Sequence, residues 1–333
     1  MRVGVVGVGI AGSSHLFDLA SNEQFTIAAV CGRRPDRVAA AADLYGASRI
    51  YDDPAAMIRT ARLDGIVIAT PPDVSPPVLA MSLQAGLPTL IEKPGARTAA
   101  ALDQVAHQAG PAAALAVVAY NRRYQHHVRY ARHLLRSDGI GPLTHVDCRW
   151  VGPFTRRYAS NETYRIGVQR GDGVLLDTAS HIVDTLMYLG IGSLVVRRAR
   201  LDSGPTGADV AARLELYSSS HCLPVSVRIE DRDSLSEDSW TMTVRGMRGN
   251  FRLDRVELTA HGEGGLMAVA ASDLRRPVDD LLDAAVGQSA LGASMTQASA
   301  VLAVIDQVRD VAESRRPWLR PRAKALGRLN GAC

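Results

Sequence analysis

The sequence predicts an α/β protein with two domains. A doubly wound parallel sheet comes first, and an α+β domain with a large, mostly antiparallel sheet follows. Three observations support this prediction. Short apolar runs alternate with helix-like segments up to residue 120. The first apolar run leads directly into a glycine-rich turn. After residue 120, consecutive runs of alternating polarity are separated by short polar turns.

Composition limits the possible classes of function. The 333 residues are 47% hydrophobic and 22% charged, so the chain can fill two packed cores. Its net charge is only +4 and the arginines are spread along the chain, so we expect no nucleic-acid partner. The four cysteines form no CxxC pair, and no apolar run is long enough to span a membrane. We therefore expect a cytoplasmic protein with reduced thiols and no membrane partner.

The N-terminal stretch predicts a dinucleotide-binding unit. An apolar strand over residues 3–8 runs into a GxGxxG pattern, and a helix over 13–21 and a strand over 25–30 follow. The glycines permit a tight turn, and they let backbone N–H groups at the helix N-terminus approach a pyrophosphate. This pattern indicates a Rossmann domain. The residues expected to bind the dinucleotide here are Gly7, Gly9, Ile10, Ala11 and Gly12.

The rest of the first domain continues the alternation. The expected helices cover residues 35–45, 54–60, 77–85 and 98–108, and the expected strands cover residues 49–51, 64–70, 88–92 and 112–120. Ligands of such a sheet bind beyond the carboxyl ends of its strands. The further residues expected there, close to the cofactor, are Gly32, Arg33, Arg34, Thr70, Pro71, Pro72, Glu92, Lys93, Asn121 and Arg122.

The predicted second domain covers residues 121–333, after a first domain of residues 1–120. It begins with a helix over 124–136, a strand over 143–151, a loop over 154–170 and a helix over 171–190. Alternating polarity then predicts strands over residues 194–201, 210–217, 223–230, 240–245 and 249–253. Two late helices are expected over residues 276–285 and 295–314.

The residues after the second strand bear on which nicotinamide cofactor binds. An acidic residue about twenty positions after the glycines normally accepts hydrogen bonds from the adenosine ribose. This chain has Cys31-Gly32-Arg33-Arg34 there, with two guanidiniums and no carboxylate. Guanidiniums suit a 2'-phosphate, so the sequence predicts NADP, with NAD as the alternative. A solvated arginine pair without function is the other interpretation.

Lys93 is one of only two lysines among the 38 basic residues. It ends a buried strand where the cofactor crevice is expected. A lysine can be tuned to exchange a proton near neutral pH, whereas an arginine cannot. This contrast favours a chemical role for Lys93, and an ion pair with Glu92 is the structural alternative.

Asp177, His181 and Asp184 are spaced i, i+4 and i+7 along an otherwise apolar helix. This spacing aligns the three side chains on one face. They could form the wall of an active site, or the histidine could be a core residue satisfied by an aspartate. They could also bind a metal ion. We expect no metal, because a dinucleotide would supply the redox chemistry.

These motifs together resemble the Gfo/Idh/MocA family, named after glucose-fructose oxidoreductase, inositol dehydrogenase and a rhizopine catabolism protein. The matching pieces are GVGIAG, ATPPD, EKPGARTAAAL, AYNRRY and GDGVLLDTASHIVD, which span nearly the whole chain. The resemblance implies that Lys93, Asp177 and His181 face the nicotinamide and the substrate, and that the bond before Pro94 is cis. The chain departs from the family's glycine run at Asp172 and Val174, and Ala179 replaces another glycine.

The resemblance implies an NAD(P)-dependent dehydrogenase that moves a hydride between nicotinamide and a carbinol or keto carbon of a sugar or cyclitol. In this mechanism His181 exchanges the hydroxyl proton, Lys93 hydrogen-bonds the same oxygen and Asp177 orients both partners. His181 and Lys93 would titrate as a coupled pair, so the sequence leaves the proton carrier open. A non-catalytic regulator with the same fold is the alternative function.

The substrate is less constrained by the sequence. Arg122, Arg123, Arg156, Arg157 and Arg165 could bind a carboxylate or a diphosphate, so both a free sugar or cyclitol and a nucleotide-linked keto-sugar remain open. The expected substrate-binding residues are Lys93, Tyr120, Arg122, Arg123, Tyr158, Tyr164, Asp177 and His181. The resemblance also implies a homodimer or homotetramer assembled through the open face of the second sheet.

Overall fold

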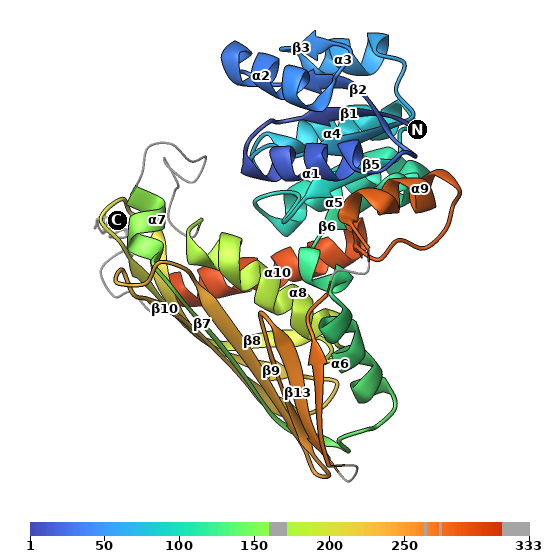
Figure 1. Ribbon diagram of the computed structural model, residues 1–333. Helices are drawn as coiled ribbons and strands as arrows, with labels where there is room; N and C mark the ends of the chain where they lie inside the picture. Colours follow the sequence, from blue (N-terminus) through green and yellow to red (C-terminus); the bar gives the residue numbers. More distant parts are fainter. Residues whose placement is uncertain (160–171, 263–264, 273–274, 315–333) are drawn as a thin grey trace, which may run out of the picture.

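The computed structural model describes residues 1–159, 172–262, 265–272 and 275–314. This part of the chain forms two sheets, each packed against helices (Figure 1). The first sheet is parallel except at one edge and the second is mostly antiparallel, which confirms the predicted fold class. Among the described residues, no helix has the length and apolar character needed to cross a membrane.

The strands of the first sheet follow the predicted alternation. They are β1 (Arg2–Val6), β2 (Thr26–Cys31), β3 (Ile50–Tyr51), β4 (Gly65–Ile68), β5 (Thr89–Glu92) and β6 (Ala116–Ala119). These strands are parallel, in the order β6-β5-β4-β1-β2-β3. The order reverses at β1, so the carboxyl ends of β1 and β4 flank the crevice where such sheets bind ligands.

Helices cover both faces of this sheet. They are α1 (Ile10–Ala20), α2 (Pro35–Tyr45), α3 (Pro54–Thr60), α4 (Ser75–Gln84) and α5 (Ala99–Ala109). Leu16 of α1 and Val38 of α2 belong to the apolar cluster on one face. Leu79 of α4 and Leu102 of α5 belong to the cluster on the other face. Burial on both faces explains why the strands are apolar throughout.

The C-terminal part of the chain returns to the first sheet. Strand β15 (Ala293–Ser294) pairs antiparallel with β6. Helix α9 (Asp280–Ala285) follows the 3-10 turn η4 (Pro277–Asp279) and packs against β4, β5 and β6. Figure 1 shows α9 beside this sheet, far from the second one. The domain boundary at residue 120 stays a prediction, and residues 277–294 pack with the earlier unit.

The second sheet has eight strands in the order β14-β13-β12-β11-β7-β10-β9-β8. They are β7 (Leu143–Gly152), β8 (Leu194–Ser203), β9 (Asp209–Ser218), β10 (Leu223–Asp231), β11 (Ser239–Gly246), β12 (Asn250–Asp254), β13 (Glu257–Gly262) and β14 (Gly265–Ala270). Only β7 and β10 pair in parallel, and the other neighbours are antiparallel.

Helices α6 (His126–Arg136), α8 (Ser180–Tyr188) and α10 (Met295–Ser314) pack on the second sheet or on one another beside it. Helix α6 packs against β12, β13 and β14, while α10 packs against β8, α8 and also α5 of the first unit. Helix α10 therefore joins the two units (Figure 1).

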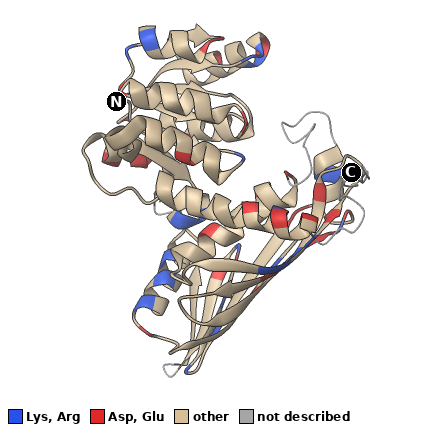
Figure 2. Ribbon diagram, turned by 180° about the vertical axis from the view of Figure 1, so that it is seen from behind, with Lys and Arg blue, Asp and Glu red and all other residues tan. Residues whose placement is uncertain are grey.

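Side chains on the strands of the second sheet include many paired charges. Arg149 on β7 lies 2.8 Å from Glu230 on β10, and Arg228 on β10 lies 3.2 Å from Asp147 on β7. Figure 2 shows acidic and basic positions interspersed on these strands. Assembly through this sheet stays a prediction.

The structure corrects several local predictions. Residues 110–115 form a 3-10 helix, η1 (Gly110–Leu115), rather than the start of a strand, because Pro111 and three alanines suit a helical turn. Residues 154–159, predicted as a loop, form α7 (Phe154–Ala159). The helix predicted over residues 171–190 is interrupted by a π-helical turn, η3 (Leu175–Ala179), before α8. Strands β13, β14 and β15 were not predicted.

Candidate active site

The glycine-rich loop connects β1 to α1 and leaves backbone N–H groups open to a ligand. Gly7 has a φ of +95°, which suits glycine, and its N–H donates to the Cys31 carbonyl at 2.8 Å. A Cβ on Gly12 would lie 1.9 Å from the Gly7 carbonyl oxygen, so only glycine fits there. The N-cap residue Gly9 has no side chain to cap α1, and Ile10 is exposed. This helix N-terminus fits a pyrophosphate.

Arg33 and Arg34 are exposed between β2 and α2, where the adenosine end of a dinucleotide is expected. Cys31 at the end of β2 is buried. Burial raises the pKa of its thiol to about 12, and the nearby Asp53 and Asp52 carboxylates add to this shift. The thiol is therefore protonated at neutral pH.

Thr70, at the carboxyl end of β4, is tied to the start of α4. Its hydroxyl lies 2.9 Å from the Ser75 hydroxyl, and Pro71 and Pro72 lie between them, partly exposed. Asn121 is exposed after β6, at the start of the 3-10 helix η2 (Asn121–Tyr124). These residues lie at the carboxyl edge of the first sheet, where such sheets bind ligands, and their contact with a cofactor stays a prediction.

Glu92 is the last residue of β5 and Lys93 follows it at the same edge, and both are partly exposed. Glu92 contacts His15 of α1, with 2.7 Å between Oε1 and Nε2, so the lysine does not depend on Glu92 for its counterion. The Lys93–Pro94 peptide bond is cis, as the resemblance implies. Lys93 Nζ donates to Asp177 Oδ1 at 2.7 Å and to the Asp177 carbonyl at 3.1 Å. The lysine of the first unit thus pairs with the aspartate of the second.

Asp209 of β9 holds the segment just before Asp177 in place. The Asp209 carboxylate accepts hydrogen bonds from the N–H groups of Gly173 at 3.0 Å and Leu175 at 2.6 Å. A Cβ on Gly173 would lie 2.0 Å from the Asp209 carbonyl oxygen. Asp177 then falls in the π-helical turn, a distortion that is frequent at functional sites. Its second oxygen accepts from the Tyr158 hydroxyl at 3.3 Å.

His181 follows Asp177 by about one turn and is surrounded by aromatic rings. The Tyr120 ring meets it edge-on at 6.2 Å, and the Trp150 ring is tilted at 6.1 Å. Tyr120 is fully buried, and burial raises the pKa of its hydroxyl well above the ordinary value. The imidazole therefore lies in an aromatic pocket and is itself only partly buried.

Arg122 is buried against two indole rings. Its guanidinium carbon lies 3.7 Å from the Trp240 ring centroid and 4.4 Å from that of Trp150. Burial lowers the pKa of Arg122 to about 9, so it remains charged at neutral pH. Trp150 is held in place because its Nε1 donates to Asp238 at 2.7 Å. The sequence predicted cofactor and substrate contacts for Arg122, but its 6% exposure leaves little surface for either.

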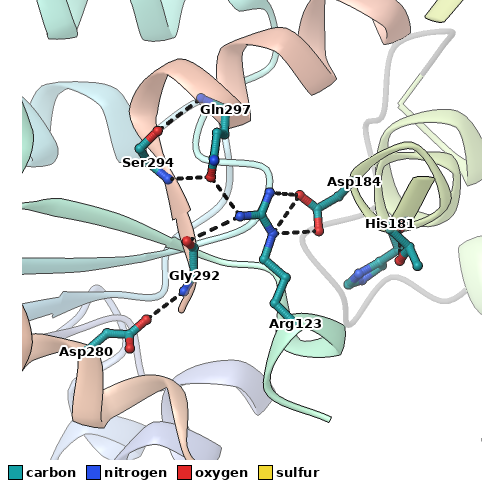
Figure 3. A network of polar contacts seen from close by, with 8 residues as sticks. Arg123, His181, Asp184, Asp280, Gly292, Ser294 and Gln297 are labelled. Atoms are coloured by element: carbon teal, nitrogen blue, oxygen red, sulfur yellow. Dashed lines mark hydrogen bonds and ion pairs between the residues drawn. The ribbon is translucent and has the colours of Figure 1, made fainter. Parts of the chain in front are cut away.

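Arg123 is fully engaged in a buried network (Figure 3). Its Nε and Nη2 donate to Asp184 on α8, with the shortest distance at 2.6 Å. Its Nη1 donates to Gln297 Oε1 at 2.7 Å and to the Gly292 carbonyl at 3.3 Å. Arg123 thus connects α8 to the returning C-terminal segment, and its role as a substrate ligand stays a prediction.

The structure brings some of the predicted site residues together and leaves others apart. Lys93, Asp177 and Tyr158 come together, although Tyr158 is only 1% exposed and contacts Asp177 from the buried side. His181 follows Asp177 by about one turn and contacts the Tyr120 and Trp150 rings. Tyr120 packs against His181 without being exposed. Tyr164 lies outside the described residues.

Sequence analysis missed Trp150, Trp240 and Asp238. The signal available was weak, because Trp150 and Trp240 occur on predicted strands far apart in sequence, over residues 143–151 and 240–245.

A metal site formed by Asp177, His181 and Asp184 does not fit the geometry. Asp177 pairs with Lys93, and Asp184 is turned toward Arg123. Within the described ranges, no group of three His, Cys, Asp or Glu side chains could hold a metal ion. Burial raises the pKa of Asp184, while Arg123 opposes that shift.

Comparison with known proteins finds matches for both units of the chain. Residues 1–135 match a family model described as an oxidoreductase family with an NAD-binding Rossmann fold, and residues 128–252 match the GFO/IDH/MocA C-terminal domain. The chain belongs to the Gfo/Idh/MocA family. As a member of this family, it is an oxidoreductase with an NAD-binding Rossmann domain.

Individual relatives in the family are distant. D-apiose dehydrogenase of Paraburkholderia graminis is 25% identical over 278 residues, which cover 80% of this chain and 72% of that protein. The rhizopine catabolism protein MocA of Rhizobium meliloti is 26% identical over 318 residues, covering 93% and 94%. A structure of levoglucosan dehydrogenase with NADH and levoglucosan has a TM-score of 0.80 at 19% identity, covering 94% of this chain and 97% of that one. This last likeness concerns the fold.

Proposed function

We propose that the protein transfers a hydride between a nicotinamide dinucleotide and a carbinol or keto carbon of a sugar or cyclitol. The observation that carries this proposal is the 2.7 Å pair between Lys93 Nζ and Asp177 Oδ1, with His181 about one turn from the aspartate. These three polar groups lie at the carboxyl edge of a dinucleotide-binding sheet.

The residues of the first unit suit a bound dinucleotide. The N-terminus of α1 offers backbone N–H groups to the pyrophosphate, and Gly12 allows α1 to approach the loop closely. When bound, the nicotinamide accepts or donates the hydride at its C4 atom. Side chains of the protein carry out the proton transfer and position the substrate.

Lys93 and His181 have different roles in this reaction. Lys93 is held by the Asp177 carboxylate and serves as a hydrogen-bond donor to the reacting oxygen of the substrate. His181 is the proton carrier, because its imidazole is partly exposed and can both accept and donate a proton. Asp177 fixes the lysine, and the Tyr158 hydroxyl fixes Asp177 in turn.

The substrate proposed is a free sugar or cyclitol rather than a nucleotide-linked keto-sugar. Three of the arginines that could bind a diphosphate have polar partners among the described residues. Arg123 pairs with Asp184, Arg157 lies 3.2 Å from Asp238, and Arg156 Nη2 donates to the Leu235 carbonyl at 2.6 Å. The names of relatives include both classes: D-apiose dehydrogenase and inositol 2-dehydrogenases act on free substrates, and a UDP-N-acetylglucosamine 3-dehydrogenase acts on a nucleotide-linked one.

The preferred cofactor is proposed to be NADP, with NAD as the alternative. Exposed Arg33 and Arg34 can pair with a 2'-phosphate. Replacing Arg33 by Asp and Arg34 by Ala should weaken NADP binding by about 10- to 100-fold and leave NAD binding nearly unchanged. Fluorescence titration with both dinucleotides measures the two dissociation constants. An unchanged preference would remove this assignment.

The decisive experiment is a substrate screen with purified protein. Each dinucleotide is combined with free sugars, cyclitols and nucleotide-linked sugars, and reduction of the cofactor is followed by absorbance. The expected result is turnover with a free polyol that is lost in the Lys93→Met variant. Tight dinucleotide binding without turnover of any carbohydrate would instead favour the non-catalytic regulator. Turnover of nucleotide-linked sugars alone would overturn the substrate class.

The active form is proposed to be a homodimer or homotetramer. An open sheet of eight strands commonly packs against a second copy, and charged residues on its strands can form pairs across such an interface. Light scattering at micromolar concentration measures the mass, and a monomer would contradict this proposal.

A further inference from the structure

Four charged side chains form a second polar cluster next to the Lys93–Asp177 pair. Arg97 donates from Nη2 to Asp172 Oδ2, and Arg309 Nη2 lies 3.7 Å from the other oxygen of Asp172. Arg309 Nη1 also donates to Asp306 Oδ1 at 2.6 Å and to the Arg97 carbonyl at 3.1 Å. The Asp172 carboxylate therefore forms ion pairs with two arginines on different elements.

The cluster connects the two segments that carry the catalytic pair. Arg97 lies four residues after Lys93, in the loop that follows β5, and Asp172 lies five residues before Asp177. Helix α10 anchors this loop a second time, because Asp306 Oδ2 accepts from the Ala99 N–H at 2.9 Å. Arg97 and Asp172 thus form a contact between the two segments, in addition to the catalytic pair itself.

The burial of these groups favours a defined geometry. The Asp172 side chain is 8% exposed and that of Arg309 is 18% exposed, whereas Arg97 is 35% exposed. Such a buried carboxylate is held in place by its cationic partners. Removing these partners destabilises a buried carboxylate far more than an exposed one. The start of the catalytic segment does not depend on this pair alone, since Asp209 holds Gly173 and Leu175 separately.

We propose that Arg97 and Asp172 are positioning residues that hold Lys93 and Asp177 at hydrogen-bond distance across the two units. This inference rests on the proposed function, because the pair matters for turnover only if Lys93 and Asp177 act on substrate. Small displacements of catalytic groups are costly in turnover, and about 1 Å can reduce a rate by as much as 100-fold. The cluster acts on catalysis through Lys93 and touches neither substrate nor cofactor.

The test compares Arg97→Gln, Asp172→Asn and the double variant with the wild-type protein. Each single variant is expected to lower kcat by about 10-fold while the dissociation constant for the dinucleotide changes by less than about twofold. The double variant should be no worse than the poorer single variant, because both changes break one interaction. Arg97→Lys, which keeps the charge, should recover part of kcat.

A second readout needs no substrate. Lys93 is one of two lysines in the sequence, so acetylation by a limiting amount of acetic anhydride can be assigned to it by peptide mass spectrometry. Loosening of the Lys93–Asp177 pair should raise the acetylation of Lys93 by about threefold or more in the Arg97→Gln and Asp172→Asn variants. Arg149→Gln is the matched control, because it breaks an ion pair with Glu230 on the second sheet, where 44% of the arginine side chain is exposed. This control should leave kcat and Lys93 acetylation unchanged.

The outcomes separate this inference from the proposed function. If the wild-type protein turns over no carbohydrate, the proposed function fails, and Lys93 acetylation still decides whether the cluster positions the lysine. Unchanged kcat and unchanged acetylation in both single variants would overturn the inference. It would also be overturned if the losses of kcat were additive and followed the fall in thermal midpoint, because the cluster would then serve only stability.

Discussion

Lys93 and Asp177 belong to different packed units of the chain, yet their Nζ and Oδ1 atoms lie 2.7 Å apart. Both side chains are mostly buried, with exposures of 13% and 12%. The pair therefore depends on how the loop after β5 meets the segment before α8. Any change that separates these two segments should affect chemistry before it affects cofactor binding.

Removing either member of this pair should reduce turnover strongly. We expect Lys93→Met and Asp177→Asn each to lower kcat by about 10²- to 10⁴-fold, the range for loss of a positioned acid–base or hydrogen-bonding group. Dinucleotide affinity should remain close to wild type, because the glycine loop is untouched. Steady-state kinetics and fluorescence titration check the two parts. Full turnover in either variant would contradict the proposed roles.

Gly12 should not tolerate even one additional methyl group. A Cβ at this position would lie 1.9 Å from the Gly7 carbonyl oxygen, so α1 would have to move away from the loop. We expect Gly12→Ala to lower the free energy of unfolding by about 1–3 kcal/mol, the usual cost of overpacking, and to weaken dinucleotide binding. Denaturant titration and cofactor titration measure these effects.

Gly9→Ala is the matched control for Gly12→Ala. A Cβ at Gly9 meets nothing within 4 Å, so the free energy of unfolding should stay within about 0.5 kcal/mol of wild type. Equal destabilisation by both substitutions would show that packing against Gly7 is not the reason for glycine at position 12.

The buried pair between Arg123 and Asp184 should be important for folding. Their side chains are 5% and 1% exposed, and Asp184→Asn would leave the guanidinium without its counterion. We expect a loss of about 3–5 kcal/mol in the free energy of unfolding. Glu230→Gln breaks the exposed pair with Arg149 and should cost about 1 kcal/mol or less. Denaturant titration measures the free energy of unfolding of both variants. Equal losses would contradict the prediction that the buried pair contributes more to stability than the exposed one.

Much of the fold and the proximity of some candidate site residues could be predicted because their signals are local. The glycine loop follows a strand directly, and parallel strands bring their carboxyl ends to one edge, which placed Lys93 near the cofactor crevice. Asp177 and His181 are about one turn apart, so their proximity follows from helix geometry. The interrupting π-turn could not be predicted, because no residue in Leu175–Ala179 marks it.

The supporting contacts could not be predicted, because they join residues far apart in sequence. Arg123 and Asp184 are 61 positions apart, and Arg97 and Asp172 are 75 positions apart. No periodicity or spacing connects such residues, so the sequence assigned Arg123 to the substrate and treated Asp172 only as a departure from a glycine run. Strand β15 was missed for the same reason, since its partner β6 is more than 170 residues earlier.

Asp209 gives a prediction for the pH dependence of stability. Burial raises the pKa of its carboxyl, and the N–H groups of Leu175 and Gly173 oppose this shift. An acid whose pKa is higher in the folded state contributes stability that is fully present below its unfolded pKa and is lost as pH rises through its folded pKa. The ionised carboxylate is thus less favourable for folding than the protonated one.

Wild-type protein and Asp209→Asn should therefore differ most at low pH. The variant loses one acceptor oxygen, which should cost about 1–3 kcal/mol, and this loss should shrink over the range that begins at about pH 4, the ordinary pKa of an aspartate in an unfolded chain. Other buried carboxyls such as Asp184 and Asp280 titrate in both proteins and cancel in the difference. Urea titrations of both proteins across this range measure the difference in their free energies of unfolding. A difference that grows with pH would mean that the two N–H donors outweigh burial and lower the pKa of Asp209 instead.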